Sequence, residues 1–266
     1  MRTIADQTKV NFLSEQYVPD NVFIYVAGGA IRVIDVNRTY TYRQGDACLA
    51  RKNSLVKYEV LSTMDSFLPI MFCFDETFLK KMQDRFSPEV KRYKSADALI
   101  DVPRSELLES FIQSIKPYYK GIMQLEEAFE DVKYQELLII LLKNQPQLAD
   151  ILFDFRKPGK IDLEGFMIKN FKFNVGIDKF AFLTGRSISS FKRDFSTIFS
   201  DTPSHWLTQK RLDEAHFQLT ANNSKPSDIY IDLGFETLSH FSFAFKKRFG
   251  YPPTEFPKDR ATRTDR

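Results

Sequence analysis

The chain has 266 residues, of which 43% are apolar and 26 are Phe, enough for two folded domains that each bury a core. Its net charge is +3, apolar runs such as residues 137–142 are far too short to cross a bilayer, and no apolar run follows the basic residue near the N-terminus, so the sequence predicts a cytoplasmic protein without an export signal. The two cysteines, Cys48 and Cys73, exclude a secreted disulfide scaffold, and we expect them to be buried thiols.

Segments with the composition of β-strands fill the first part of the chain. Apolar, β-branched and aromatic residues alternate or cluster over residues 22–26, 31–34, 39–42, 47–50 and 67–74. Turn signals separate them, among them Gly28-Gly29 and Gly45-Asp46. We therefore predict hairpins that close into a small sandwich or barrel, and assign residues 1–104 to a β-rich domain.

The spacing of apolar residues becomes helical after Asp75. One helix is expected around residues 78–86, a second from Ser105 that Pro117 interrupts, and a third over about residues 125–143. The third helix is apolar nearly all round at residues 137–142. It is interpreted either as a core helix between domains or as a contact between subunits, so residues 105–155 are assigned to a helical linker or dimerisation region.

Residues 156–160, Arg-Lys-Pro-Gly-Lys, are typical of a linker because they are charged and contain Pro-Gly. A helical domain is predicted over residues 156–257, followed by a charged tail over residues 258–266. Residues 160–266 hold 17 Lys and Arg against 13 Asp and Glu, whereas the rest of the chain holds 21 against 22. This imbalance permits a polyanionic partner for the second domain without proving one.

The second domain contains an internal repeat. A shift of fifty positions superposes Asp178 on Asp228, Leu183 on Leu233, Ser189 on Ser239, Phe191 on Phe241, Phe195 on Phe245, Phe199 on Phe249 and Pro203 on Pro253. Two copies of one small helical unit are therefore predicted. A longer helix over residues 204–220 would join them.

Each copy has the pattern of a helix, a turn and a second helix. In the first copy a short helix over residues 177–184 is followed by Gly185 in the turn and by Ser187 as the cap of the next helix, and in the second copy a short helix from Pro226 through Leu233 is followed by Gly234. The apolar spacing predicts buried positions at Ile188, Phe191, Phe195 and Phe199, and at Leu238, Phe241, Phe245 and Phe249. The opposite faces would expose Ser189, Lys192, Arg193 and Ser196 in the first copy, and Ser239, Ser242, Phe243 and Lys246 in the second.

The exposed faces suit the major groove of DNA. An α-helix fits that groove, where Lys and Arg donate to guanine and small hydroxyl residues allow close approach. Two such helices on one scaffold can enter successive major grooves if they stand about 34 Å apart. The alternative is that the two helical hairpins merely fill space.

The residues of both copies resemble the DNA-binding domain of the AraC/XylS family of bacterial transcription regulators. In the first copy the resemblance rests on residues 180–187 and 191–195, and on Arg211-Leu212 with Ala215. In the second copy it rests on residues 232–235, 239–242 and 245–253. It implies a domain of about seven helices with two helix-turn-helix units, which binds double-stranded DNA and most often activates transcription by recruiting RNA polymerase.

By position, the resemblance assigns base-facing roles to Ser189, Lys192 and Arg193 in the first copy and to Leu238, Ser239, Ser242 and Phe243 in the second. Phosphate-facing roles are expected from position on the helices, at their starts for Ser187 and Thr237 and near the end of the second helix for Lys246, Lys247 and Arg248. Ser190, Ser196 and Thr197 are also expected to face phosphates. Phe243 departs from the family pattern, in which many members carry arginine. The second helix is therefore expected to add apolar contact with thymine methyl groups, or mainly phosphate anchoring.

The N-terminal half resembles the family in layout alone: a cupin-like sensing domain, then helices that pair two subunits in many members, which makes the expected fold α+β. Its signal is expected to be a small effector in a pocket of the barrel, or a regulatory protein or second subunit on an exposed apolar face near residues 107–142.

All three histidines, His205, His216 and His240, lie in the second domain, so neither a metal site nor a cofactor is predicted. No acid, base and nucleophile converge, so no enzyme is predicted. The alternative is a cupin-type small-molecule binding protein or enzyme with an incidental helical domain.

Overall fold

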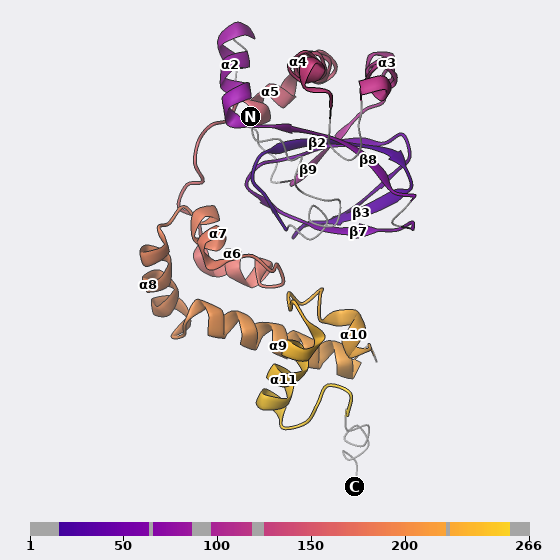
Figure 1. Ribbon diagram of the computed structural model, residues 1–266. Helices are drawn as coiled ribbons and strands as arrows, with labels where there is room; N and C mark the ends of the chain where they lie inside the picture. The colour runs from indigo at the N-terminus through magenta and orange to yellow at the C-terminus, as the bar shows by residue number, and fades with distance from the viewer. Residues whose placement is uncertain (1–15, 64–65, 87–96, 119–124, 222–223, 256–266) are drawn as a thin grey trace. The chain divides into compact units, whose positions relative to one another are not determined.

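The computed structural model describes residues 16–63, 66–86, 97–118, 125–221 and 224–255. It divides into two compact units, Met1–Lys157 and Pro158–Arg266, so the division falls inside the segment interpreted as a linker. The fold is α+β, with sheets and helices in the first unit and helices in the second (Figure 1). None of the helices in the described ranges is long and apolar enough to cross a membrane. Nor do three His, Cys, Asp or Glu residues of those ranges come together in a way that could hold a metal ion.

The N-terminal unit contains two larger antiparallel sheets that face each other (Figure 1). The four-stranded sheet has the order β8 (Leu68–Phe74), β2 (Asn21–Gly28), β5 (Ala47–Ala50) and β9 (Leu99–Val102). The three-stranded sheet has the order β4 (Thr39–Arg43), β3 (Ala30–Ile34) and β7 (Lys57–Val60), and β1 (Tyr17–Val18) pairs with β6 (Ser54–Leu55). Of the predicted sandwich or barrel, the sandwich is therefore confirmed, but the predicted hairpins are mostly wrong. Among the described strands only β3 and β4 pair as consecutive neighbours, while the turns at Gly28-Gly29 and Gly45-Asp46 carry the chain from one sheet to the other.

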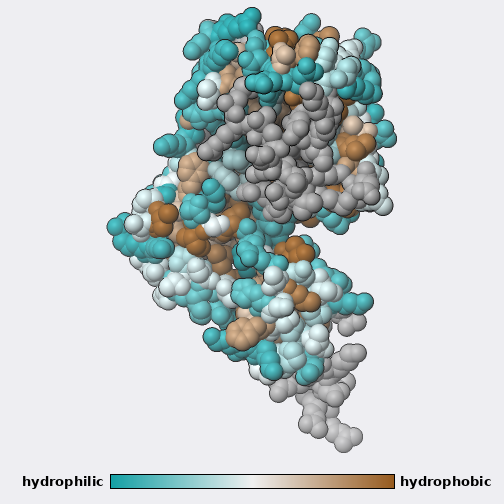
Figure 2. Space-filling view, in the orientation of Figure 1, coloured by the Kyte–Doolittle hydropathy of each residue, from teal (hydrophilic) through white to brown (hydrophobic). Residues whose placement is uncertain are grey.

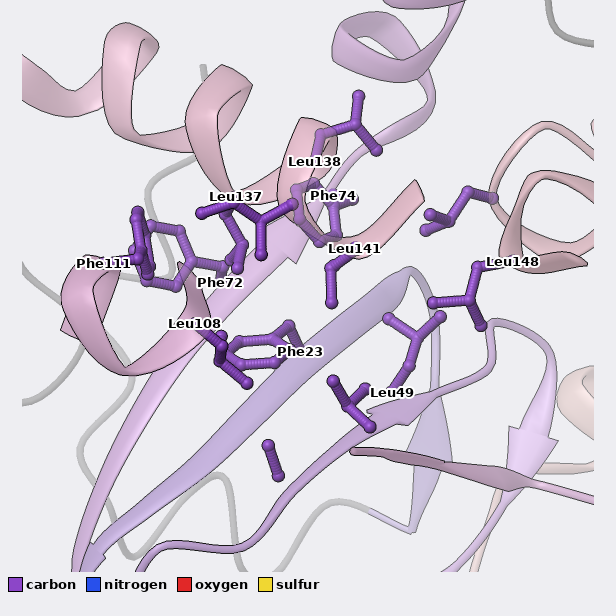
Figure 3. Close-up of a cluster of buried hydrophobic side chains, with 14 of the residues drawn as sticks. Phe23, Leu49, Phe72, Phe74, Leu108, Phe111, Leu137, Leu138, Leu141 and Leu148 are labelled. Carbon is purple, nitrogen blue, oxygen red and sulfur yellow. The ribbon is translucent and has the colours of Figure 1, made fainter. Parts of the chain in front are cut away.

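Alternation along the four-stranded sheet sends side chains into two separate cores. Phe23, Leu49 and Phe72 point toward the helices (Figure 3), whereas Ile24 and Cys48 belong to the core between the sheets. Because both faces of this sheet are buried, its strands carry nearly continuous apolar runs. Burial raises the pKa of the Cys48 thiol above its usual range, so this group stays protonated.

Helices cover the outer face of the four-stranded sheet. They are α2 (Glu76–Phe86), α3 (Glu106–Ile115), α4 (Glu127–Asn144) and α5 (Ala149–Leu152), with short 3-10 turns at η2 (Lys116–Tyr118) and η3 (Pro146–Leu148). The Ser105 hydroxyl caps α3 by accepting the Leu108 N–H at 3.2 Å. The α-helix ends at Ile115, as expected from Pro117, whose ring cannot continue it.

Helix α4 buries one side and exposes apolar residues on the other. Leu137, Leu138 and Leu141 are fully buried against the sheet and its covering helices. Val132 and Ile139, two turns apart, are 61% and 47% exposed. The apolar character all round this helix therefore reflects a core contact on one side and an uncovered apolar strip on the other.

The prediction missed four short strands. After Asp75 only helices were expected, yet the chain returns to the sheet at β9, where Val102 lies opposite Ala47 on β5. Strands β1, β6 and β7 were also missed. Segments of two to four residues are too short to show a period, so their pairing depends on tertiary contacts.

The C-terminal unit holds six α-helices within the described residues, where the family layout implies about seven. They are α6 (Leu163–Asn170), α7 (Ile177–Leu183), α8 (Ile188–Phe199), α9 (Pro203–Ala221), α10 (Pro226–Ile229) and α11 (Leu238–Phe249). The long helix α9 runs between α8 and the α10–α11 pair (Figure 1). Near its start Trp206 packs edge-on against Phe195 of α8, and near its end His216 stacks on Phe245 of α11. About 15 Å of helix separates these two contacts, so α9 is a rigid spacer between the two helix-turn-helix units.

Helix α10 is shorter than predicted. It ends at Ile229, and residues 230–234 form turns in which the Gly234 N–H donates to the Ile231 carbonyl at 2.9 Å. In these turns Ile231 is 57% exposed, whereas Leu233 is fully buried. The positive φ of Gly234, 81°, ends the helical spiral and turns the chain toward α11.

Candidate nucleic-acid interface

The first helix-turn-helix unit consists of α7, a turn at residues 184–187, and α8. Gly185 has a φ of 66°, a left-handed conformation that glycine adopts without cost. The Ser187 hydroxyl then accepts the Ser190 N–H at 3.3 Å and caps α8. At the other end Ser200 takes a left-handed conformation and closes the helix. The ends of α8 are therefore fixed by local sequence.

The exposed face of α8 carries the predicted base-facing residues of the first copy. Ser189, Lys192 and Arg193 are all exposed, and the Arg193 side chain keeps 78% of its surface. Phe191 and Phe195 on the opposite face are fully buried. Helical geometry thus presents two cationic side chains and one small hydroxyl together to solvent.

One predicted burial on each of these helices is wrong. Ile188 is 47% exposed and Leu238 is 40% exposed. Each is the first residue of its helix, where no preceding turn lies over it, so it stays at the edge of the core. Leu238 is therefore available for the base-facing role that the family resemblance gives it.

A buried arginine fixes the first turn. The Arg186 side chain is 7% exposed, and it donates to Asp194 Oδ2 at 3.1 Å and to the carbonyls of Thr184 at 2.8 Å and Ile161 at 3.0 Å. The hydrogen bond from Arg186, with help from Lys160, lowers the pKa of Asp194. This arrangement ties the turn, α8 and the segment after the linker into one body. The sequence reasoning gave Arg186 no role.

The second unit repeats these caps. The Thr237 hydroxyl accepts the His240 N–H at 3.1 Å at the start of α11, and Gly250, with a φ of 83°, ends the helix. Thr237 stands fifty positions after Ser187, and Gly250 fifty after Ser200. Helices α8 and α11, the two predicted recognition helices, have twelve residues each and therefore begin and end at equivalent positions.

The exposed face of α11 differs in chemistry from that of α8. Ser239 and Phe243 are exposed, Phe243 at 70%, while Ser242 is half-buried. Phe241 and Phe245 are fully buried on the opposite face. The second helix therefore presents a phenyl ring where the first presents a guanidinium.

The predicted phosphate-facing residues differ in how far they are already bound within the chain. Lys246 and Lys247 are exposed at the end of α11, whereas Arg248 pairs with Asp213 of α9, with 3.1 Å from Nε to Oδ1. Several hydroxyls already bind backbone: Thr197 donates to the Arg193 carbonyl and Ser196 to the Asp201 carbonyl, while Ser187 and Thr237 accept helix-start N–H groups. Ser190 is half-buried. Among these predicted phosphate-facing residues, Lys246 and Lys247 thus carry their charge in exposed positions, whereas Arg248 already shares its charge with Asp213.

Arg211 of α9 ties the segment between α6 and α7 to the turn before α11. Its Nε donates to the Phe171 carbonyl at 2.8 Å, Nη2 to the Phe173 carbonyl at 2.7 Å and Nη1 to the Gly234 carbonyl at 2.9 Å. Burial lowers the pKa of Arg211 to about 10, so the group stays charged at neutral pH. Sequence reasoning missed this clamp. The sequence did offer one signal for a buried role of Arg211, namely its place directly before Leu212, which faces the core.

Each of the three histidines of the C-terminal unit contacts a nearby side chain. His205 pairs with Asp201, 2.7 Å from Nδ1 to Oδ2, and the His216 ring lies 3.1 Å from the Tyr251 hydroxyl. His240 packs edge-on against Phe235. Within the described residues, none of these three contacts joins a histidine to both a carboxylate and a nucleophile. What the unit offers is two capped helices with exposed faces.

Two families match the sequence. Residues 21–151 match the family described as the ExsA N-terminal regulatory domain. Residues 180–259 match a family described as a helix-turn-helix domain. The first match covers most of the N-terminal unit, including α2 to α4, and the second covers both α8 and α11.

Similar proteins cover nearly the whole chain. The virulence regulon transcriptional activator VirF of Yersinia enterocolitica is 24% identical over 248 residues, which are 90% of this chain and 89% of VirF. The HTH-type transcriptional regulator ExsA of Pseudomonas aeruginosa is 21% identical over 85% of this chain and 82% of its own. Among solved structures, an apo ToxT variant from Vibrio cholerae aligns with a TM-score of 0.44 at 14% identity, over 90% of this chain and 89% of that one.

Proposed function

This chain belongs to the AraC/XylS family of transcriptional regulators, and from that premise we propose that it activates transcription by placing α8 and α11 in successive major grooves of one DNA duplex. It is a DNA-binding regulator, and its N-terminal unit is the regulatory part. RNA polymerase is the partner that an activator of this family recruits. The protein would act by binding rather than by catalysis, in the bacterial cytoplasm where the DNA lies.

One observation carries this proposal. Two helices of equal length, with equivalent caps, each keep one face exposed and the opposite face, with two Phe residues, buried, and both pack against one spacer helix. Helices that merely filled space would have no need to leave Lys192 and Arg193 uncovered beside a small Ser189. The buried clamp at Arg211 also fixes the turn before α11 to the segment that leads into α7, which favours a pre-organised C-terminal unit.

Replacing Arg193 by alanine is expected to weaken binding to a selected DNA site by about 1–3 kcal/mol, because it removes a donor to guanine. The site would be obtained by selection from a random duplex library with the full chain. Binding to unrelated duplexes should barely change. Fluorescence anisotropy on both kinds of duplex measures the effect, and Lys169→Ala, which removes a charge from exposed α6, is the control. An equal loss on both kinds of duplex would refute a reading role for Arg193.

Lys247→Ala should give the opposite pattern. An exposed lysine at the end of α11 that meets a phosphate contributes equally to every sequence. Its loss should weaken binding to selected and unrelated duplexes alike and lower the slope of log K against log salt by about one unit. An unchanged slope would remove Lys247 from the phosphate contacts.

The N-terminal unit supports control by a protein surface better than control by a small effector. Large side chains are buried between its sheets, among them Phe67, Met71, Tyr40 and Tyr42. By contrast, Val132 and Ile139 of α4 leave apolar surface exposed. Figure 2 shows brown, hydrophobic surface at the end of this unit where the helices lie. We place a second subunit on this strip, with a regulatory protein as the alternative occupant and a small effector as the runner-up signal.

Charging this strip should break self-association. The full chain is expected to elute as a dimer, and Val132→Glu with Ile139→Glu as a monomer, because two carboxylates would be buried unpaired in the contact. Light scattering after size exclusion measures both masses. Leu68→Glu is the control, because Leu68 is the first residue of β8, outside the α4 strip, and is 55% exposed. A dimer that survives the double substitution would contradict this placement.

A further inference from the structure

The two recognition helices carry different chemistry at the same place. The fifty-residue repeat sets Phe243 of α11 where α8 has Arg193, and Ser242 where α8 has Lys192. Both helices have twelve residues and start from a hydroxyl cap at the equivalent position. Equivalent positions on equivalent helices reach equivalent depths of a groove, so the difference lies in what each helix can recognise there.

Phe243 is held out in water. At 70% it is the most exposed large apolar side chain in the part of the chain that the structure describes. It lies on the side of α11 opposite the fully buried Phe241 and Phe245, one turn after the exposed Ser239. Among the described residues of this unit, the core is therefore formed without this ring, which leaves it free for an apolar contact with a binding partner.

A phenyl ring selects among DNA bases by apolar contact alone. In the major groove, guanine, adenine and cytosine present hydrogen-bonding groups, whereas thymine also presents its C5-methyl group. Phe243 cannot donate or accept a hydrogen bond, so the thymine methyl is the feature of a base edge that it can bind favourably. Small Ser239 on the same face lets the helix come close, and Leu238, 40% exposed at the first turn, adds a second apolar surface.

We propose that Phe243 is a specificity-determining residue that reads a thymine by its methyl group, so that the DNA site has a guanine-bearing half under α8 and a thymine-bearing half under α11. This rests on the proposed function, since it requires both helices to enter DNA. Lys246 and Lys247, exposed one turn further along α11, supply the phosphate contacts that hold the ring against the base.

The experiment uses a site selected from a random duplex library by the full chain. Each thymine of that site is replaced in turn by deoxyuridine, which removes only the methyl group. At one or two positions, all in the same half of the site, affinity should fall about fourfold, the effect of exposing one methyl-sized apolar group. The matched proteins are Phe243→Ala, for which these positions should become insensitive to the replacement, and Arg193→Ala, which should keep the fourfold effect.

The outcomes separate this inference from the function on which it rests. If no site is enriched by the selection, the proposed function fails. If a site is enriched but wild-type protein and Phe243→Ala respond equally to deoxyuridine at every position, DNA binding stands and the reading role of Phe243 is overturned. The fluorescence of Trp206, the only tryptophan in the sequence, checks that each variant keeps the fold of the C-terminal unit.

Discussion

Replacing Arg211 by alanine is expected to destabilise the C-terminal unit by about 3–5 kcal/mol. Each hydrogen bond from a charged donor contributes about 1.5–3 kcal/mol, and water that enters the cavity replaces only part of the three lost hydrogen bonds. The carbonyls of Phe171, Phe173 and Gly234 would lose their donor together. They come from the segment after α6 and from the turn before α11. Sequence-specific DNA binding should therefore fall even under conditions in which the protein remains folded.

The single tryptophan makes this effect measurable in the full chain. Trp206 is buried against Phe195 and Phe199, so denaturant unfolding followed by its fluorescence reports on the C-terminal unit alone. Arg211→Lys keeps the charge but cannot reach three carbonyls with one ammonium, so it should recover only part of the loss. The control Arg193→Ala, an exposed arginine, should change stability by about 0.5 kcal/mol or less. A loss for Arg211→Ala as small as that of the control would contradict the clamp.

Gly185→Ala should also cost several kcal/mol. The residue has a φ of 66°, which costs an alanine about 1–2 kcal/mol. In addition, a Cβ there would overlap the carbonyl of Gly159 and lie 2.5 Å from the amide nitrogen of Lys160, an overpacking worth about 1–3 kcal/mol. Backbone cannot swing aside as a side chain can, so we expect a total loss of about 2–5 kcal/mol in the Trp206-detected unfolding.

Two other glycines separate the two causes of that loss. Gly250 has a φ of 83°, but an added Cβ would have nothing within 4 Å, so Gly250→Ala should show the conformational cost alone. Gly159→Ala, also with nothing within 4 Å of its Cβ, should be nearly neutral. Equal losses for Gly185→Ala and Gly250→Ala would mean that the segment after the linker does not press on the first turn.

Features with many regularly spaced residues could be predicted from the sequence. Both recognition helices followed from Phe residues at helical spacing, and the repeat made the second prediction a check on the first. Strands β2, β5 and β8 followed from runs long enough to show their composition. The caps at Ser187 and Thr237 followed from local chemistry, because a hydroxyl at a helix start bonds within its own turn.

Features fixed by long-range contact could not be predicted. Strand β9 has four residues and gains its place by pairing with β5, far away in the sequence. The roles of Arg186 and Arg211 depend on carbonyls contributed by other segments, and an arginine in a helix pattern usually indicates a solvated face. Ile188 and Leu238 fit the apolar period but begin their helices, where the core does not reach. The assignment of individual residues to bases and phosphates stays a prediction.

The central claim is that α8 and α11 enter one duplex side by side, and hydroxyl-radical footprinting of the full chain on a selected site tests it most directly. The account predicts two protected stretches on the same face of the DNA, with centres about 10 base pairs apart, one helical turn. Arg193→Ala should mainly weaken protection of the stretch under α8, and Lys247→Ala should mainly weaken protection of the stretch under α11. A single protected stretch, or two stretches on opposite faces of the helix, would contradict it.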